Sequence, residues 1–224
     1  EAPAGSVHLV ADMDRDGAPD AVRLREWTPF GHLGVEVAIG QHDFETCLLH
    51  DVTVQPPRAG AGYALVDWKG DGRPDLWAFD TGGATVRVEI YRWESRYRKR
   101  AVIRPAVSSS RAVSLLAGDH DRDGIGDLYV VRAGSPGSVE VWAGPGFTTR
   151  LVNADLGMAV SSGYRLGLGD YDVDGIPDVY LLTPGGAAVL RVALGGRGFS
   201  LVGPVRTAVG AHPADTLQIA DYDG

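Results

Sequence analysis

Cysteine is almost absent from this 224-residue sequence, because Cys47 is the only one. A single cysteine cannot form an intramolecular disulfide, so the redox compartment cannot be deduced from cysteine usage. Free cysteine is among the most buried residue types, and we therefore interpret Cys47 as a small core residue. A chain of this length can bury a substantial hydrophobic core without a cross-link.

Long hydrophobic runs and an excess of positive charge are also missing. No stretch of about 18 apolar residues occurs, so no segment is predicted to cross a bilayer. No charged-then-apolar leader begins at Glu1, and we expect that any such segment has been removed or lies upstream. With 29 acidic against 21 basic side chains and a formal net charge of −8, nucleic acid is not an expected partner.

Catalytic motifs are lacking as well. The six histidines form no H-E-x-x-H motif, no G-x-S-x-G segment occurs, and the glycines mark turns rather than a phosphate-binding loop. We therefore expect a protein that is not an enzyme and has no catalytic residue. His120, which lies inside one of the acidic loops described next, is interpreted as a solvent-facing residue between ligand positions.

What the sequence does contain is a repeated acidic loop. Residues 12–20 read DMDRDGAPD, residues 119–127 read DHDRDGIGD and residues 170–178 read DYDVDGIPD. Two carboxylates ~4 Å apart repel by ~1 kcal/mol even in water, so such a loop calls for a cation. Aspartates at positions 1, 3, 5 and 9, with the carbonyl of position 7, form an oxygen-only cage that suits Ca²⁺ better than Mg²⁺. The alternative is a solvated Asp/Gly turn, which regular recurrence makes less favourable.

An EF-hand loop begins in the same way, but the rest of the sequence argues against it. An EF-hand needs a glutamate at position 12 and flanking helices. Position 12 of these three loops and of a related loop at residues 67–75 is instead Arg23, Val130, Leu181 and Ala78, respectively. The flanking runs, such as SLLAGD before a loop and DLYVV after it, are short and rich in apolar residues, which predicts strands. Each loop is therefore predicted to connect two strands.

The loops recur at a nearly constant period once the related segment DWKGDGRPD at residues 67–75 is included. Successive loops start 55, 52 and 51 residues apart, and a further 51 residues lead to DYDG at 221–224. This period indicates a repeat architecture, and four short antiparallel strands per repeat are typical of a propeller blade. In the last full unit the strands are predicted near residues 164–169, 178–182, 187–194 and 198–202. We predict an all-β propeller with repeats at roughly 1–57, 58–108, 109–160 and 161–212, and a fragment at 213–224.

The segment GYRLGLGDYDVDGIPDVY at residues 163–180 resembles the FG-GAP repeat of integrin-α-type β-propellers, called a VCBS-type repeat in bacterial proteins. The resemblance covers the whole chain as four units and a fragment. It implies that the loop between the first two strands of a blade binds Ca²⁺. The implied side-chain ligands are Asp12, Asp14, Asp16, Asp20, Asp119, Asp121, Asp123, Asp127, Asp170, Asp172, Asp174 and Asp178. The implied carbonyl ligands belong to Ala18, Ile125 and Ile176.

The second loop departs from the others at its third position, which is Lys69. We predict that this ammonium lies among Asp67, Asp71 and Asp75 as an internal counter-ion and replaces the cation. Three Ca²⁺ sites and one metal-free loop are therefore expected.

The end of the sequence bears on the size of the ring. Residues 216–224 read TLQIADYDG, the opening strand and half the acidic loop of a fifth unit. We expect the four blades to belong to a larger ring, and the resemblance suggests seven blades in all. The alternative is a closed four-bladed ring with a dangling or swapped last strand.

The predicted calcium sites favour a location outside the cell. Extracellular modules bind Ca²⁺ with dissociation constants of ~10⁻⁴–10⁻³ M, and only the extracellular Ca²⁺ concentration comes near to saturating such sites. We expect a secreted or surface module that recognises a glycan or a protein at a propeller face without catalysis. The alternative is an accessory domain, or the propeller itself, of a secreted polysaccharide lyase or hydrolase. Two further features are candidates for contact with a partner. The basic stretch at residues 91–104 is interpreted first as a solvated outer strand, and binding of an anionic polymer or an acidic protein is the alternative. Trp27 and Trp142 are candidates for stacking on sugars, although tryptophan is more commonly buried.

Overall fold

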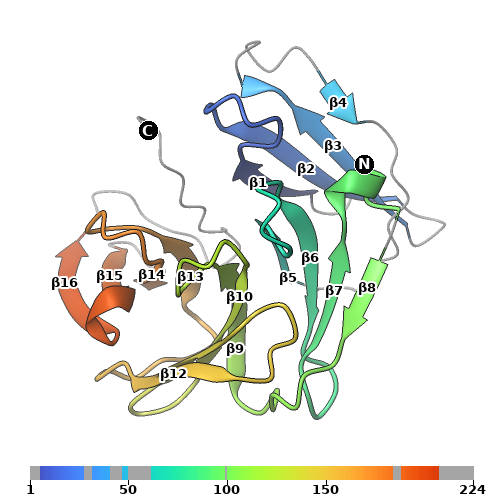
Figure 1. The fold of residues 1–224 in the computed structure, drawn as a ribbon. Helices are drawn as coiled ribbons and strands as arrows, with labels where there is room; N and C mark the ends of the chain where they lie inside the picture. Colours follow the sequence, from blue (N-terminus) through green and yellow to red (C-terminus); the bar gives the residue numbers. More distant parts are fainter. Residues whose placement is uncertain are drawn as a thin grey trace.

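Each predicted repeat folds into a sheet of four antiparallel strands that follow one another in sequence order, as the all-β prediction required. The structure is a computed structural model that describes residues 6–27, 32–40, 47–49, 62–98, 100–183 and 188–206 (Figure 1). We call the sheets blades 1 to 4 in chain order. Their strands are β1 (Ser6–Ala11), β2 (Asp20–Trp27), β3 (His32–Ala38) and β4 (Cys47–Leu49); β5 (Gly62–Val66), β6 (Asp75–Asp80), β7 (Arg87–Tyr91) and β8 (Arg100–Ile103); β9 (Ala112–Gly118), β10 (Asp127–Arg132), β11 (Ser138–Trp142) and β12 (Arg150–Asp155); β13 (Arg165–Gly169), β14 (Asp178–Thr183), β15 (Val189–Leu194) and β16 (Ser200–Arg206).

In blades 2 and 3 the second strand is buried on both of its faces. All six residues of β10 are buried. Because successive side chains of a strand point to opposite faces, Leu128 and Val130 pack in one hydrophobic cluster with blade 2, while Tyr129 and Val131 pack in another with blade 4. This double burial explains why the segments after the second and third loops, DLWAF and DLYVV, are continuous apolar runs rather than alternating patterns.

Three hydrophobic clusters join consecutive blades. Leu24 and Leu76 belong to the cluster between blades 1 and 2. The ring of Trp77 lies 5.4 Å from the ring of Phe147 in the cluster between blades 2 and 3. The third cluster joins blades 3 and 4 and includes Phe199. Burial of apolar surface between sheets therefore holds neighbouring blades together.

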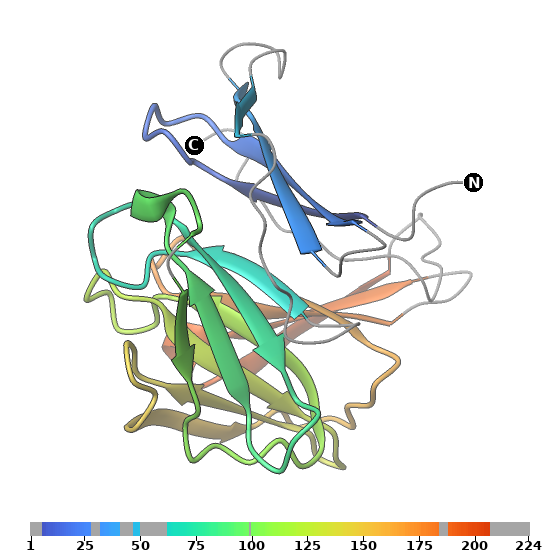
Figure 2. The same ribbon diagram turned by 90° about the vertical axis from the view of Figure 1, so that its right-hand side faces the viewer.

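The first strand of every blade lies innermost. β1 contacts β5, β5 contacts β9, and β9 contacts β13. These four strands border a hollow of about 180 Å³ whose wall includes Leu9, Tyr63, Leu116 and Leu168. The four blades are arranged around these inner strands (Figures 1 and 2), which is the arrangement of a β-propeller.

The number of blades in the complete ring stays a prediction. The predicted fifth strand, at residues 216–221, lies outside the described residues. Among the described residues, Val7 packs into the cluster between blades 1 and 2, and no hydrophobic cluster joins blade 1 to blade 4. The side chains of Trp27 and Cys47 also fall outside the described part. No helix in that part is long and apolar enough to cross a membrane.

Candidate metal centres

The first aspartate of each acidic loop shapes the loop by accepting backbone hydrogen bonds. In the third loop, Asp119 Oδ1 accepts the N–H of Asp123 at 3.2 Å and Oδ2 accepts that of Gly124 at 2.8 Å. The first and fourth loops repeat this pattern. Gly124 has a φ of 86°, a left-handed conformation that glycine adopts without steric cost. The D-x-D-x-D-G spacing thus encodes a tight turn before any cation is considered.

The ninth aspartate ties the loop to the blade. Asp127 begins β10 and is 1% exposed. Its Oδ2 accepts the N–H of His120 and its Oδ1 accepts that of Gly144, both at 2.8 Å. The pKa of Asp127 is raised to about 6, chiefly by burial and also by the nearby charges of Asp121 and Asp119, while the two backbone hydrogen bonds oppose this rise. A bound cation would favour the ionised form and offset the cost of burial.

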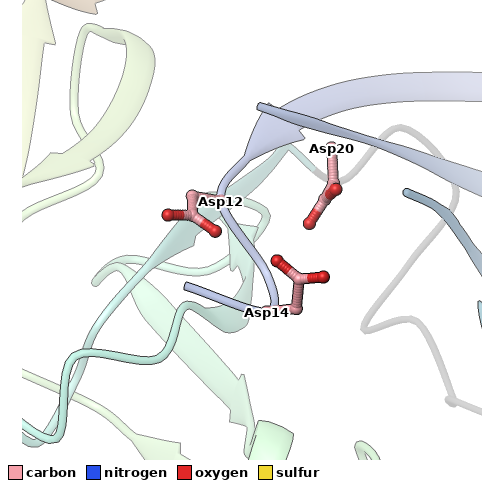
Figure 3. A group of neighbouring side chains, drawn as sticks. All are labelled: Asp12, Asp14 and Asp20. Atoms are coloured by element: carbon pink, nitrogen blue, oxygen red, sulfur yellow. The ribbon is translucent and has the colours of Figure 1, made fainter. Parts of the chain in front are cut away.

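Three loops bring carboxylates together. In each, oxygens from positions 1, 3 and 9 lie within 4.8 Å of one another, and Figure 3 shows the first of these groups. Ligands at about 2.3–2.6 Å on opposite sides of a Ca²⁺ ion are about 5 Å apart, so these separations suit a shared cation. The groups are Asp12, Asp14 and Asp20; Asp119, Asp121 and Asp127; and Asp170, Asp172 and Asp178.

The fifth-position aspartates lie outside these groups. Each instead accepts the backbone N–H of position 7 through its Oδ1. The N···O distance is 2.7 Å between Ala18 and Asp16 and 2.8 Å between Ile176 and Asp174. Asp123 makes the same bond with Ile125. Ligation by these carboxylates and by the position 7 carbonyls stays a prediction. The structure therefore gathers three of the four predicted side-chain ligands in each of these loops.

One oxygen in the fourth loop has no protein partner that would satisfy it. Asp172 Oδ1 is buried and is among the described side-chain atoms without a hydrogen bond, while its Oδ2 pairs with Arg197 at 3.1 Å. A buried polar oxygen without a donor costs free energy. A hard cation held between Asp170, Asp172 and Asp178 would supply the missing interaction. The residues present therefore fit an oxygen-ligated metal ion.

The second loop corrects one prediction. The ammonium of Lys69 lies 3.6 Å from Glu94 Oε1 and is not paired with Asp67, Asp71 or Asp75 among the described ion pairs. Glu94 belongs to the short 3-10 helix η2 (Trp93–Ser95), which follows β7, and its Oε1 also pairs with Arg92. Asp67 and Asp75 accept backbone hydrogen bonds instead, as the equivalent residues do in the other loops. Whether this loop is free of metal stays a prediction.

His120 is not the solvent-facing residue that the sequence suggested. Its side chain is half-buried, its Nδ1 lies 3.0 Å from the Tyr129 hydroxyl, and its ring stacks on Phe199 of blade 4 at 5.9 Å. Burial lowers the pKa of His120, while the neighbouring Asp121 and Asp119 act in the opposite direction. The equivalent Met13 and Trp68 also pack between blades. In the first three loops, position 2 therefore lies at a blade interface, and the apolar character of Met13 and Trp68 was the sequence signal for it, whereas Tyr171 at position 2 of the fourth loop is 50% exposed.

The other candidate contact residues have partners within the blades. In the basic stretch, Arg92 pairs with Glu94, and Arg100 pairs with the buried Glu89 at 3.1 Å. The ring of Trp142 packs against the cluster between blades 2 and 3, and its Nε1 donates to Glu140 Oε2 at 3.1 Å. These contacts favour structural roles for these residues.

The comparison with protein families addresses the repeat itself. Residues 67–130 match the family model of the FG-GAP-like repeat. The match begins at the first position of the second loop and ends inside β10, so this FG-GAP-like repeat contains the third loop and its aspartate group. The predicted resemblance is thereby confirmed for this segment. FG-GAP repeats often bind calcium and are typically extracellular. No curated protein matches the chain.

Proposed function

We propose that the chain is a calcium-binding propeller module that recognises a protein or a glycan outside the cell without catalysis. The FG-GAP propeller fold suits a binding or accessory module. The observation that carries the proposal is the equivalent placement of three aspartate groups, each within 4.8 Å, at the same loop of three blades. The buried, unpaired Asp172 Oδ1 adds a second argument, because it lacks the positive partner that a cation would provide.

Calcium is the cation that we propose, on the grounds of ligand chemistry. The gathered atoms are all carboxylate oxygens, which hard cations prefer. The loops are irregular turns whose carboxylates already accept backbone hydrogen bonds, so they offer a loose cage rather than the strict octahedron that Mg²⁺ requires. Bound calcium would neutralise the crowded carboxylates and keep the loops closed. Near 1 mM Ca²⁺, a site with a Kd of about 0.1 mM adds about 1.4 kcal/mol to folding stability.

A binding role is favoured by how the acidic residues are used. In the three groups, the first and ninth aspartates each accept at least two backbone N–H groups, which fixes their position and leaves them poorly suited to proton transfer. The loops lie next to one another, since Gly126 N–H of the third donates to the Asp67 carbonyl of the second at 2.6 Å. Calcium would therefore order one continuous loop surface, and we propose that ligand binding there depends on calcium.

The test has two parts. Metal-free protein is titrated with Ca²⁺ in a calorimeter, and we expect about three sites with a rise in melting temperature. A glycan array and an extracellular-protein array are then probed with Ca²⁺ and with EDTA, beside an assay for polysaccharide cleavage. Binding that is lost in EDTA, without cleavage, supports the proposal. Cleavage of a polysaccharide would favour an enzymatic role, and a protein that takes up no Ca²⁺ would overturn the metal sites.

A further inference from the structure

The fourth position of one acidic loop contacts the sixth position of the next loop. Arg15 Nε donates to the Gly72 carbonyl at 2.9 Å, and its guanidinium fills the space that a β-carbon on Gly72 would occupy. Gly70 is in turn so close to the third loop that a β-carbon on it would lie 3.5 Å from the Gly124 carbonyl. The same neighbour relation therefore recurs at successive blade interfaces.

At the third interface the contact is made by Arg122. Its Nη1 donates to the carbonyl of Asp174 at 3.0 Å, and its Cδ would lie 3.3 Å from a β-carbon on Gly175. Gly175 is the sharp bend of the fourth loop, with a φ of 81°. Arg122 thus holds the peptide group at the bend of the neighbouring loop, between two residues that shape its aspartate group.

The backbone explains why the fourth position reaches across. Residues at this position are left-handed in all four loops, with φ of 67° at Arg15, 72° at Gly70, 61° at Arg122 and 57° at Val173. The aspartates on either side of Arg122, at positions 3 and 5, are Asp121 and Asp123. Asp121 belongs to the aspartate group of the third loop, so a cation held there fixes the backbone from which Arg122 extends.

We propose that Arg122 couples the third and fourth loops, so that a cation in one loop raises the affinity of the other. This inference rests on the proposed calcium binding. When the third loop is ordered, Arg122 is fixed against Asp174 and Gly175, and the fourth loop loses less conformational freedom on binding its own cation. By linkage the effect is reciprocal.

The positive charge of Arg122 acts against this coupling, but it is the weaker effect. The side chain is exposed, so its repulsion of a cation in the fourth loop is screened over ~8 Å at physiological salt. The hydrogen bond to Asp174 is a direct contact that screening reduces less. Arg122 is thus a positioning residue for the fourth loop and not one of its ligands.

The experiment measures the two loops separately in the full chain. Metal-free protein is titrated with Ca²⁺, and hydrogen exchange of peptides covering residues 119–127 and 170–178 gives a midpoint for each loop. In R122G, which places at this position the residue that the second loop has naturally, we expect the midpoint of the fourth loop to rise about fivefold. D121N, which removes a ligand from the third loop, should raise it by a similar factor.

The double variant R122G/D121N tests the coupling itself. If Arg122 carries the effect of the third loop, the double variant shifts the midpoint of the fourth loop no further than either single variant. R15G is the matched control, because Arg15 occupies the same position but rests on the second loop. It should leave the midpoints of the third and fourth loops unchanged.

Two results would overturn the proposal: an unchanged fourth-loop midpoint in R122G, or additive shifts in the double variant. Should R122G fail to fold, R122K carries the test, because lysine keeps the charge but not the planar donors, and its fourth-loop midpoint should rise as well. If Ca²⁺ protects none of the loops in the unmodified protein, the proposed calcium binding itself fails, which is a different outcome.

Discussion

The guanidinium of Arg197 lies 3.1 Å from Oδ2 of Asp172, at the third position of the fourth loop. At the third position of the second loop, Lys69 lies 3.6 Å from Glu94 Oε1. Arg197 and Glu94 belong to the short 3-10 helices η3 (Gly195–Arg197) and η2, each of which follows the third strand of its blade. Blades 2 and 4 therefore hold equivalent ion pairs with the charges exchanged: the third loop position is basic and the 3-10 helix acidic in blade 2, and the reverse in blade 4. The charge of the third position is thus balanced by the neighbouring 3-10 helix.

Removal of the Arg197 charge should strengthen cation binding in the fourth loop. The guanidinium competes with a cation for Asp172, but Arg197 is 66% exposed, so the competition is modest. We expect Arg197→Gln to lower the Ca²⁺ midpoint of residues 170–178 about two- to threefold, measured by hydrogen exchange. Arg165→Gln, the same change of charge elsewhere in blade 4, serves as the control. A weaker or unchanged affinity would contradict the competition.

Lys69→Asp should turn the second loop into a further metal site. The substitution supplies the third-position carboxylate that the other three loops have, beside Asp67 and Asp75. We expect the Ca²⁺ stoichiometry, measured by calorimetry and by metal analysis after dialysis, to rise by one. Lys69→Ala removes the ammonium without adding a ligand and should leave the stoichiometry unchanged. If both variants gain a site, charge alone and not ligation excludes metal from the natural loop.

Gly126→Ala should destabilise the contact between the second and third loops. The other loops have proline at this eighth position, whereas the Gly126 N–H donates to the Asp67 carbonyl at 2.6 Å. A β-carbon there would lie 2.8 Å from Val66 Cγ2, so backbone or side chain must shift. We expect the free energy of unfolding in urea to fall by about 1–3 kcal/mol.

The control for this prediction is Gly146→Ala in the same blade. A β-carbon on Gly146 would meet its first neighbour at 3.9 Å, so this variant should change the free energy of unfolding by less than about 0.5 kcal/mol. Equal losses in the two variants would contradict the role that we assign to the close approach of the two loops.

The metal-free protein should become more stable as the pH falls from about 7 to 5. Burial raises the pKa of Asp75 and of Asp127 to about 6, and it also raises the pKa values of Asp20 and Asp178. In this window the folded chain binds protons that the unfolded chain releases, so acidification favours folding. His120 has a lowered pKa and acts in the opposite direction, but it is one group against four.

Saturating Ca²⁺ should reverse this dependence on pH, because protons then compete with the cation for the same carboxylates. Melting temperatures measured between pH 7.5 and 5 with and without Ca²⁺ check both signs. A melting temperature of the metal-free protein that falls steadily over this range would show that the buried aspartates are not the dominant titrating groups.

Much of the architecture was predictable from local pattern. The loop at residues 170–178 has strands on both sides, and the strands predicted near 164–169 and 178–182 appear as β13 and β14 with shifts of one residue. The last two predicted strands begin two residues later than expected, as β15 and β16. The segment between them was predicted as a turn from its glycines, and it contains the one-turn 3-10 helix η3. A short apolar run and a fixed loop spacing are short-range signals, so they can be recognised without tertiary information.

The partners of individual side chains were not predictable in the same way. Lys69 was expected to pair with the carboxylates next to it in sequence, but it pairs with Glu94, 25 positions away. His120 was expected in solvent, but it packs on Phe199. In both cases the partner comes from a segment that only the folding of blades places nearby, so local spacing contains no information about it.

The sequence by itself determined the repeat, the strand–loop–strand units and the positions of the aspartates within each loop, because spacing along the backbone sets these directly. Only the tertiary structure decided how the loops meet. Arg122 reaches Asp174 across 52 positions because two blades pack side by side. Burial and neighbour contacts are properties of the packed blades, and they are what turn separate acidic loops into one connected surface.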